Sequence, residues 1–297
     1  MHAPYLRKSI GSRVFDAVNV TLMLVFAFLL LYPFYNQLVL SFNEGVDAQR
    51  GGVYFWPRRP TLESYAWLFR NSKLLRGAAV SIMRVVAGTL TCLFGSALLG
   101  YITTIRYFSG RRIMRILFVV TMYFGGGMIP TYLLIMRLGL LNTFTVYWLP
   151  YAISGYYMLL FSSYLNQLPD SLFEAARVDG ASELRIFFQI VVPVSVPVLA
   201  AISIYLTVGQ WNAWFDNMLY NTNGNWDTLQ MYLRRMLLQA EVALKMQAEA
   251  IAYHRAMSLT PQTIKAATTM IVTLPILIAY PFFQRFFIGG ITLGSVK

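Results

Sequence analysis

A polar stretch between two apolar runs organises the chain: residues 169–193 have the sequence PDSLFEAARVDGASELRIFFQIVVP. Ser171 is followed three residues later by Glu174, which is the capping-box spacing of a helix N-terminus. Gly180 predicts the end of that helix, because glycine adopts the left-handed backbone conformation at little steric cost. Ser182 is placed to cap a second helix. The stretch therefore predicts two short helices hinged at a glycine.

The composition is that of a membrane protein. The 297 residues are 57% hydrophobic and only 12% charged, and the mean hydropathy is +0.55, which lies outside the usual range of soluble domains. The long unbroken apolar runs favour an all-α membrane protein over a barrel of alternating strands. The net charge of +12 is spread over loops and the flanks of apolar runs, so it indicates a membrane and no nucleic-acid partner.

Six apolar runs are close to the about 20 residues that cross the hydrocarbon core of a bilayer. The first is longer than the apolar region of a signal peptide and no cleavage site follows it, so we expect an uncleaved span. The six predicted transmembrane helices lie near residues 17–38, 77–102, 116–136, 143–165, 190–215 and 266–288.

Lysine and arginine gather on the cytoplasmic side of membrane proteins. Three occur before the first run and four in the loop 103–115, which predicts that both termini are cytoplasmic. The loop 43–76 has six basic and three acidic residues and would lie outside, but loops of its length are weaker determinants. The expected segments are a cytoplasmic N-terminus (1–16), the first transmembrane helix (17–42), an external loop (43–76), a membrane core (77–288) and a cytoplasmic tail (289–297). The core would include a cytoplasmic hairpin between spans 4 and 5 (169–189) and an external segment (217–265).

Several expected spans contain helix-breaking residues. Gly126, Gly127 and Pro130 fall in the third, and Pro275 and Pro281 in the sixth. Such breaks are tolerated where neighbours or a cavity satisfy the backbone, so they predict a hinge or a translocation path. The alternative is close helix packing, which we favour for the small residues of the second span: Gly88, Gly95, Ser96 and Gly100.

Four polar or amphipathic residues are candidates for a solute path. Arg84 lies inside the second span, where a charge indicates function unless the side chain extends to the membrane surface. Trp211, Asn212 and Trp214 end the fifth span. Aromatic rings and amides suit sugar recognition, but tryptophans at a span end also form the interfacial aromatic belt. For Arg84, function and extension to the surface both remain open. For the end of the fifth span, sugar recognition and the aromatic belt both remain open.

Two helix starts are predicted near the external segment. Asp227 or Thr228 would cap an amphipathic helix through about Leu238, and Thr260 with Pro261 would open the last span.

The sequence contains no motif for an energy source or a cofactor. None of the five lysines completes a G-x-x-x-x-G-K loop, and there is neither an H-E-x-x-H motif nor a set of Cys and His with metal-ligand spacing. The apolar runs hold no paired carboxylates of the kind that proton-coupled carriers use. We therefore expect no enzyme activity, no cofactor and no metal in this chain, and a partner that supplies energy if transport is uphill.

The polar stretch resembles the E-A-A-x-x-x-G-x9-I-x-L-P signature of permeases of ABC importers. Glu174-Ala175-Ala176, Gly180, Ile190 and Pro193 match it, and only Val192 replaces the usual leucine. The stretches GGMIPTYLL (126–134), LGLLNT (138–143) and GQWNAW (209–214) are similar to carbohydrate permeases of the maltose-importer type, in the subgroup for complex oligosaccharides. The resemblance covers nearly the whole chain.

That resemblance implies a set of partners in the bacterial cytoplasmic membrane. A second permease subunit, in a heterodimer, would complete the pore within the lipid. Two ATPase subunits would bind ATP and Mg, and an extracytoplasmic solute-binding protein would deliver the oligosaccharide. The hairpin would be the coupling helix seated on the ATPase, with Gly294–Lys297 as a weaker second contact. The coupling residues implied are Glu174, Ala175, Ala176, Asp179, Gly180, Ile190 and Pro193.

Three questions stay open on the sequence alone. Glu174 either pairs with a basic residue of the ATPase or completes its own capping box. The subgroup favours an acidic plant or algal oligosaccharide, for instance from pectin or alginate. The competing hypotheses are a secondary carrier or channel for small polar solutes, and a membrane scaffold or sensor that transports nothing.

Overall fold

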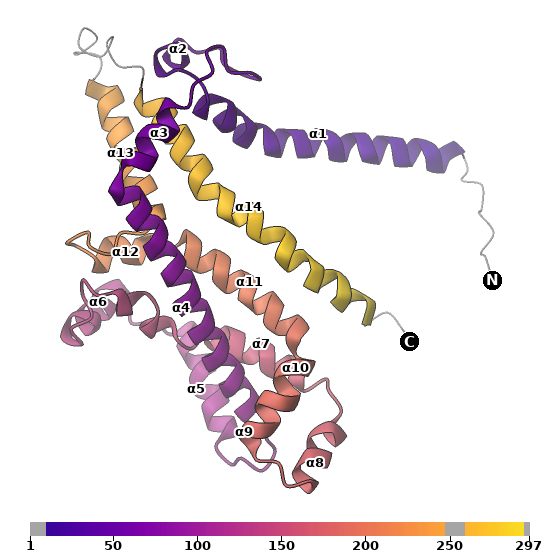
Figure 1. Cartoon of the computed structure of the whole chain (residues 1–297). Coiled ribbons are helices and arrows are strands. Elements are labelled where there is room, and N and C mark those ends of the chain that lie inside the picture. Colours follow the sequence, from indigo (N-terminus) through magenta and orange to yellow (C-terminus); the bar gives the residue numbers. More distant parts are fainter. Residues whose placement is uncertain (1–9, 247–258, 294–297) are drawn as a thin grey trace. The chain divides into compact units, whose positions relative to one another are not determined.

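The structure is a computed structural model, and it describes residues 10–246 and 259–293 (Figure 1). Helices account for the regular structure of these residues. They form no strand, and the one isolated β-bridge joins Asn43 and Pro60. The predicted all-α class is confirmed to this extent.

The chain divides into two compact units. The first comprises residues up to Arg70 and Met236–Ile271, and the second comprises Asn71–Arg235 and the residues from Val272 onward.

The first unit begins with the long helix α1 (Ile10–Ser41), followed by α2 (Gly45–Gln49) and α3 (Glu63–Arg70). Its small hydrophobic core joins the end of α1 to α2, to the loop after it and to the start of α14 (Pro261–Leu293); its buried members are Val39, Leu40, Ala48, Val53 and Ala266. As predicted, α14 begins at Pro261, and the Thr260 hydroxyl accepts a 3.5 Å hydrogen bond from the Thr263 N–H.

The second unit is built around α4 (Ser72–Ile102), which packs against α7 (Gly155–Leu165) and α11 (Val196–Asn212). The remaining elements are α5 (Arg111–Tyr123), α6 (Met128–Arg137), the 3-10 turns η1 (Phe144–Tyr147) and η2 (Leu149–Tyr151), α8 (Asp170–Val178), α9 (Glu183–Ile186), the π-helical turn η3 (Phe187–Val191), α10 (Val192–Val194), α12 (Phe215–Tyr220) and the start of α13 (Leu229–Met246), whose residues from Met236 onward belong to the first unit. The start of α13 agrees with the prediction, because the Thr228 hydroxyl accepts a hydrogen bond from the Met231 N–H, but α13 extends beyond the expected end at Leu238.

Small residues let the neighbours of α4 approach closely. A Cβ atom added to Gly88 would lie 2.5 Å from the Gln210 side chain, and one added to Gly95 would lie 2.6 Å from the Ala152 carbonyl oxygen. Ser96 also belongs to this face, since its hydroxyl accepts a 3.0 Å hydrogen bond from the Ser154 N–H. The packing interpretation of these small residues is confirmed.

Among the described residues, three helices are long and apolar enough to cross a membrane: Ile10–Ser41, Ser72–Ile102 and Pro261–Ile278. Two further pairs would qualify if each bent pair is one span. Arg111–Tyr123 with Met128–Arg137 is bent by 117°, and Glu183–Val194 with Val196–Asn212 by 82°. The structure thus contains three to five candidate spans.

The expected helix over residues 143–165 is wrong as a single element. Its first half consists of η1 and η2, and only α7 is α-helical. Pro150 provides no N–H, and the Ser154 N–H bonds to Ser96 of α4 instead of to a carbonyl one turn earlier. The 11 residues of α7 rise about 16 Å, which is about half of the hydrocarbon thickness.

The helix-breaking residues act differently in the two other spans concerned. The expected break of the third span is present, because Gly127 has a φ of +83° between α5 and α6. In contrast, α14 continues through Pro275 and Pro281, so a break at these two prolines is not observed.

The close approach at Gly95 generates a stability prediction. Gly95→Ala places a methyl group against the Ala152 carbonyl, which is backbone and cannot rotate away. We expect overpacking to lower the stability by about 1–3 kcal/mol, seen as a lower melting temperature of the purified chain in detergent. Gly209→Ala is the control, because nothing lies within 4 Å of its added Cβ atom. Equal melting temperatures for both variants would contradict the tight packing at Gly95.

Candidate functional site

The hairpin at residues 169–193 has the predicted glycine hinge. Helix α8 ends at Val178, and Gly180 has a φ of +77°. The Ala181 N–H bonds to the Ala176 carbonyl and the Gly180 N–H to the Arg177 carbonyl, each at 3.0 Å. This pair of bonds is the Schellman motif, which satisfies the last carbonyls of a helix.

The two predicted caps of the hairpin have different outcomes. Ser182 caps α9, since its hydroxyl accepts a hydrogen bond from the Arg185 N–H. The capping box of Ser171 with Glu174 is wrong: α8 begins at Asp170, its N-cap residue is Pro169, and no side chain caps it. The proline ring fixes φ at a value suited to helix entry, so the helix starts before Ser171 and leaves that residue inside the first turn.

Glu183 ties the hairpin to the rest of the second unit. One carboxylate oxygen accepts hydrogen bonds from Arg177 Nε (2.8 Å) and the Tyr107 hydroxyl (2.5 Å), and the other accepts one from the Tyr101 hydroxyl. These partners lie on α8, in the loop after α4, and near the end of α4. Partial burial raises the pKa of Glu183, but the three donors outweigh it, and the pKa lies below its ordinary value. The sequence interpretation missed this residue.

A basic cavity of about 860 Å³ lies between the loop 103–115 and the hairpin. Asp170 forms an ion pair with Arg106 at its edge, and Glu174 contributes to the wall. The other charged lining residues are all arginines: Arg111, Arg112, Arg115 and Arg177. Cations therefore outnumber carboxylates in this cavity.

The predicted coupling residues divide into an outer and an inner set. Glu174 is exposed and has no polar partner among the described residues; Ala175, Asp179, Gly180 and Pro193 are exposed as well. Ala176 and Ile190 are partly buried and pack against the hydrophobic core that α4, α7 and α11 share. The tail residues 294–297, proposed as a second contact, lie outside the described residues.

A second cavity, of about 600 Å³, is lined by α4, the turn η2 and the end of α11. Three of the predicted path residues line it: Arg84, Asn212 and Trp214. The other aromatic residues that line it are Tyr151, Tyr157, Tyr205 and Phe215. Aromatic faces beside amide groups can stack on and hydrogen-bond a polar ring such as a sugar.

Arg84 neither extends to the surface nor offers a free charge. Its guanidinium pairs with both carboxylate oxygens of Asp216, at 3.0 and 2.5 Å, and only 2% of the side chain is exposed. Its Nε donates to the Gln210 amide oxygen (3.0 Å), and the group lies 4.8 Å from the centre of the Tyr147 ring. The alternative in which Arg84 extends to the membrane surface is therefore wrong: Arg84 is one half of a buried ion pair, and the sequence analysis did not identify its partner, Asp216. A role of Arg84 in the solute path stays a prediction.

The other path residues have different roles. The Trp211 indole N–H donates to the Val272 carbonyl (3.1 Å), so this ring is buried in packing. The Arg234 guanidinium lies over the Trp214 ring, 3.7 Å from the ring centre. Gly126 and Gly127 lie in the bend between α5 and α6, and Pro130 lies in the first turn of α6. All three are exposed and line neither cavity. No group of three or more metal-ligand side chains occurs in the part of the chain that is described.

Known proteins are similar to this chain in sequence and in fold. The family model for the "binding-protein-dependent transport system inner membrane component" matches residues 2–292. Protein LplC of Bacillus subtilis is 35% identical, covering 97% of this chain and 96% of its own. The polygalacturonan/rhamnogalacturonan transport system permease protein YtcP of the same organism is 34% identical, covering 96% and 99%. The crystal structure of a bacterial ABC transporter involved in the import of the acidic polysaccharide alginate matches with a TM-score of 0.84 at 27% identity, covering 96% of this chain and all of the matched chain.

The Glu183 contacts predict how the hairpin responds to mutation and pH. Glu183→Gln removes the charge that three donors share, so we expect the amides of residues 170–186 to exchange with deuterium about fivefold faster, corresponding to about 1 kcal/mol. Asp179→Asn, an exposed change in the same hairpin, is the control. The pKa of Glu183 is lower in the folded protein than the ordinary value of 4.5. Its contribution to the stability of the hairpin is therefore present above that ordinary pKa and is lost as the pH falls through the pKa of the folded state. Unchanged exchange in Glu183→Gln would contradict the role.

The Arg84–Asp216 pair predicts strong coupling between two positions. Arg84→Met leaves a buried carboxylate unpaired, which we expect to destabilise the protein by about 3–5 kcal/mol. Adding Asp216→Leu should recover most of that loss, because an apolar pair needs no compensating charge. Denaturant unfolding of the two single variants and the double variant measures the coupling. Additive effects would show that the two side chains do not act as a pair.

Proposed function

The chain belongs to the family of binding-protein-dependent transport system inner membrane components, and we propose that it is the permease subunit that forms half of the pore of an ATP-driven oligosaccharide importer. As a member of this family it is a transport component of the inner membrane and not an enzyme. The observation that carries the proposal is the hairpin, which is attached to the second unit through Glu183 and presents the exposed carboxylate of Glu174 on α8.

We propose six spans with both termini in the cytoplasm. The lysine and arginine distribution supports this orientation. The bent pair α5–α6, the short α7 and the bent pair Glu183–Val194 with Val196–Asn212 would account for the three spans that are not continuous helices. Under this topology the hairpin 169–189 is cytoplasmic, and the loop 43–76 and the segment 217–265 are external. The segments 17–42, 77–288 and 289–297 keep the assignments expected from the sequence.

The hairpin is the proposed contact with an ATPase subunit, which would hold ATP and Mg. Since α8 lacks the capping box, Glu174 is free to pair with a basic residue of a partner. The short side chain of Ala175 beside it permits a close approach. Asp179, Gly180 and Pro193 are the other exposed members of the coupling set. Ala176 and Ile190 would fix the hairpin on the hydrophobic core that α4, α7 and α11 share. The hydrogen bonds of Glu183 join the hairpin to α4 and to the loop after it, so the hairpin and α4 would move together.

The proposed solute path includes the second cavity. Asn212, Trp214 and the tyrosine rings around them supply stacking faces and hydrogen-bonding groups for an oligosaccharide. One relative is named for polygalacturonan/rhamnogalacturonan transport, and the similar structure is titled for import of alginate. An acidic oligosaccharide is therefore the proposed substrate class. Arg84 would not bind its carboxylates, because Asp216 already neutralises it. A second permease subunit would form the other half of the path, and a solute-binding protein would deliver the sugar.

The test is sugar-stimulated ATP hydrolysis. The chain is reconstituted in liposomes with the second permease, ATPase and binding protein encoded by neighbouring genes, and acidic oligosaccharides are compared with maltose. We expect Glu174→Lys to reduce stimulated hydrolysis at least about tenfold, since losing one partner of an interfacial charge pair costs about 2–5 kcal/mol.

Glu63→Lys is the matched control. Like Glu174, Glu63 is an exposed glutamate near the start of a helix, in this case α3. It should leave hydrolysis unchanged. Normal stimulation in an assembled Glu174→Lys complex would refute the coupling role. Uptake by the chain alone, without ATPase or ATP, would refute the importer proposal and favour a channel or carrier.

A further inference from the structure

The loop after α2 folds back along the first transmembrane helix. The Tyr35 hydroxyl donates to the Phe55 carbonyl at 2.7 Å, and the Asn36 amide donates to the carbonyls of Val53 (3.0 Å) and Tyr54 (3.3 Å). The rings of Tyr32 and Phe55 also contact, with centroids 5.7 Å apart. Residues 53–56 therefore lie beside the last turns of α1 and not beyond its end.

The sequence of α1 gives the depth of that position in the membrane. No charged residue occurs from Ala17 to the end of the helix at Ser41. Counting the about 20 residues that cross the hydrocarbon core from Ala17 reaches Asn36. Tyr32, Tyr35 and Asn36 are also the amphipathic side chains expected where hydrocarbon meets headgroups. The loop 53–56 thus lies at the level of the membrane interface.

The side chains of the loop suit that level. Tyr54, Phe55 and Trp56 are consecutive, and 60%, 54% and 78% of their surfaces are exposed. They continue the apolar surface of α1, whose most apolar window contains no buried residue. Aromatic rings with polar edges, such as those of tyrosine and tryptophan, are enriched at membrane interfaces because one part is apolar and the other forms hydrogen bonds.

The backbone carbonyls of the loop form hydrogen bonds within the protein, which suits an environment with little water. An unpaired carbonyl at membrane depth is costly, yet the three consecutive carbonyls of residues 53–55 all accept hydrogen bonds from α1 side chains. A loop designed to remain in water would not need this arrangement, since water itself would satisfy the carbonyls.

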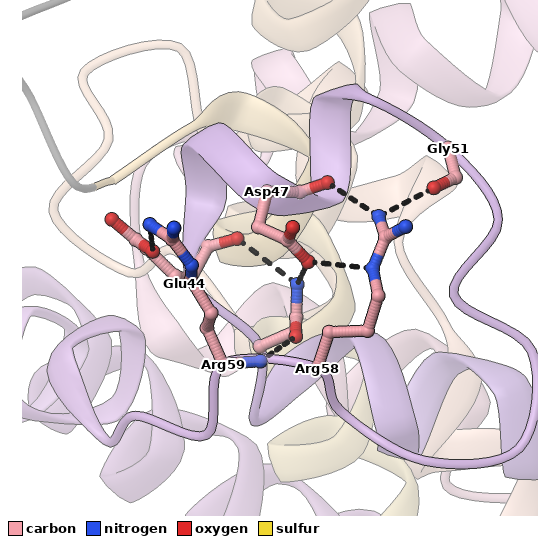
Figure 2. Close-up of polar contacts among 6 residues, drawn as sticks. Glu44, Asp47, Gly51, Arg58 and Arg59 are labelled. Carbon is pink, nitrogen blue, oxygen red and sulfur yellow. Dashed lines mark hydrogen bonds and ion pairs between the residues drawn. The ribbon is translucent and has the colours of Figure 1, made fainter.

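Polar contacts hold the base of the loop in place, as Figure 2 shows. Arg58 Nε pairs with the Asp47 carboxylate at 3.0 Å, and its Nη2 donates to the carbonyls of Asp47 and Gly51. The Arg59 guanidinium pairs with Glu44 at 3.0 Å. Both ends of the loop are therefore fixed, at the base by arginine contacts and at the tip by α1.

We propose that residues 53–56 are an interfacial membrane anchor, in which Tyr54, Phe55 and Trp56 insert into the lipid leaflet at the C-terminal end of α1. The lipid interface is the occupant that the depth, the aromatic side chains and the satisfied backbone all fit. In the six-span topology this is the outer leaflet. The inference does not depend on the ATPase contact or on the substrate.

The test measures where a label at position 56 resides. Trp56→Cys is made in a Cys92→Ala background, labelled with a nitroxide, and reconstituted in liposomes with the other subunits. Relaxation by O2, which concentrates in the membrane, is compared with relaxation by a water-soluble nickel chelate. Arg50→Cys is the control, because Arg50 is exposed at the end of α2, away from the tip. We expect O2 to dominate at position 56 and the chelate to dominate at position 50.

A second measurement keeps the native aromatic residues. Lipids brominated near the headgroups should quench the tryptophan fluorescence of the unsubstituted protein more than that of Trp56→Phe, and the difference reports Trp56 itself. Chelate dominance at position 56, or equal quenching in both proteins, would overturn the proposal. Protection of position 56 from both relaxing agents when sugar-loaded binding protein is added would also overturn it, in favour of a protein docking site.

Discussion

Every backbone N–H and C=O at membrane depth must find its partner within the protein, because lipid offers none. This constraint explains both the helices of the second unit and the places where they stop. Where the helical pattern fails near Ser154, the Ser96 hydroxyl of α4 satisfies the free N–H. Where α11 ends, the Ala213 carbonyl lies within 3.4 Å of the Arg84 guanidinium. Side chains of α4 thus replace missing helical bonds of its neighbours, and the close packing of α4 against them brings these groups within reach.

The same constraint accounts for the arrangement of charge in the second unit. An isolated arginine within a span is costly, and the carboxylate of Asp216 with the Gln210 amide satisfies the donors of Arg84. The pair joins α4 to α12 beside the second cavity. A buried pair of this kind is weak support for stability, since apolar residues can replace it, but it fixes the relative position of the two elements that it joins.

Local chemistry was predictable from the sequence, and distant pairing was not. The glycine stop at Gly180 and the helix starts after Ser182 and Thr228 follow from residues within one helical turn. The capping box failed because Pro169 starts α8 earlier than Ser171 would. Glu183 and Arg84 depend on partners 82 and 132 residues away in sequence, and no periodicity or spacing links such positions. The break near Ser154 likewise needs Ser96, which lies 58 residues earlier.

The contacts of Glu183 have a mechanical consequence. Tyr101 lies 17 residues after Arg84 on the uninterrupted helix α4, which is roughly 26 Å along the helix axis. One end of this rod contacts α9 through Glu183, and a point farther along it forms the wall of the aromatic cavity. Because α4 has no break between these two contacts, we expect a shift of α9 that keeps its contact with Tyr101 to move the cavity wall as well.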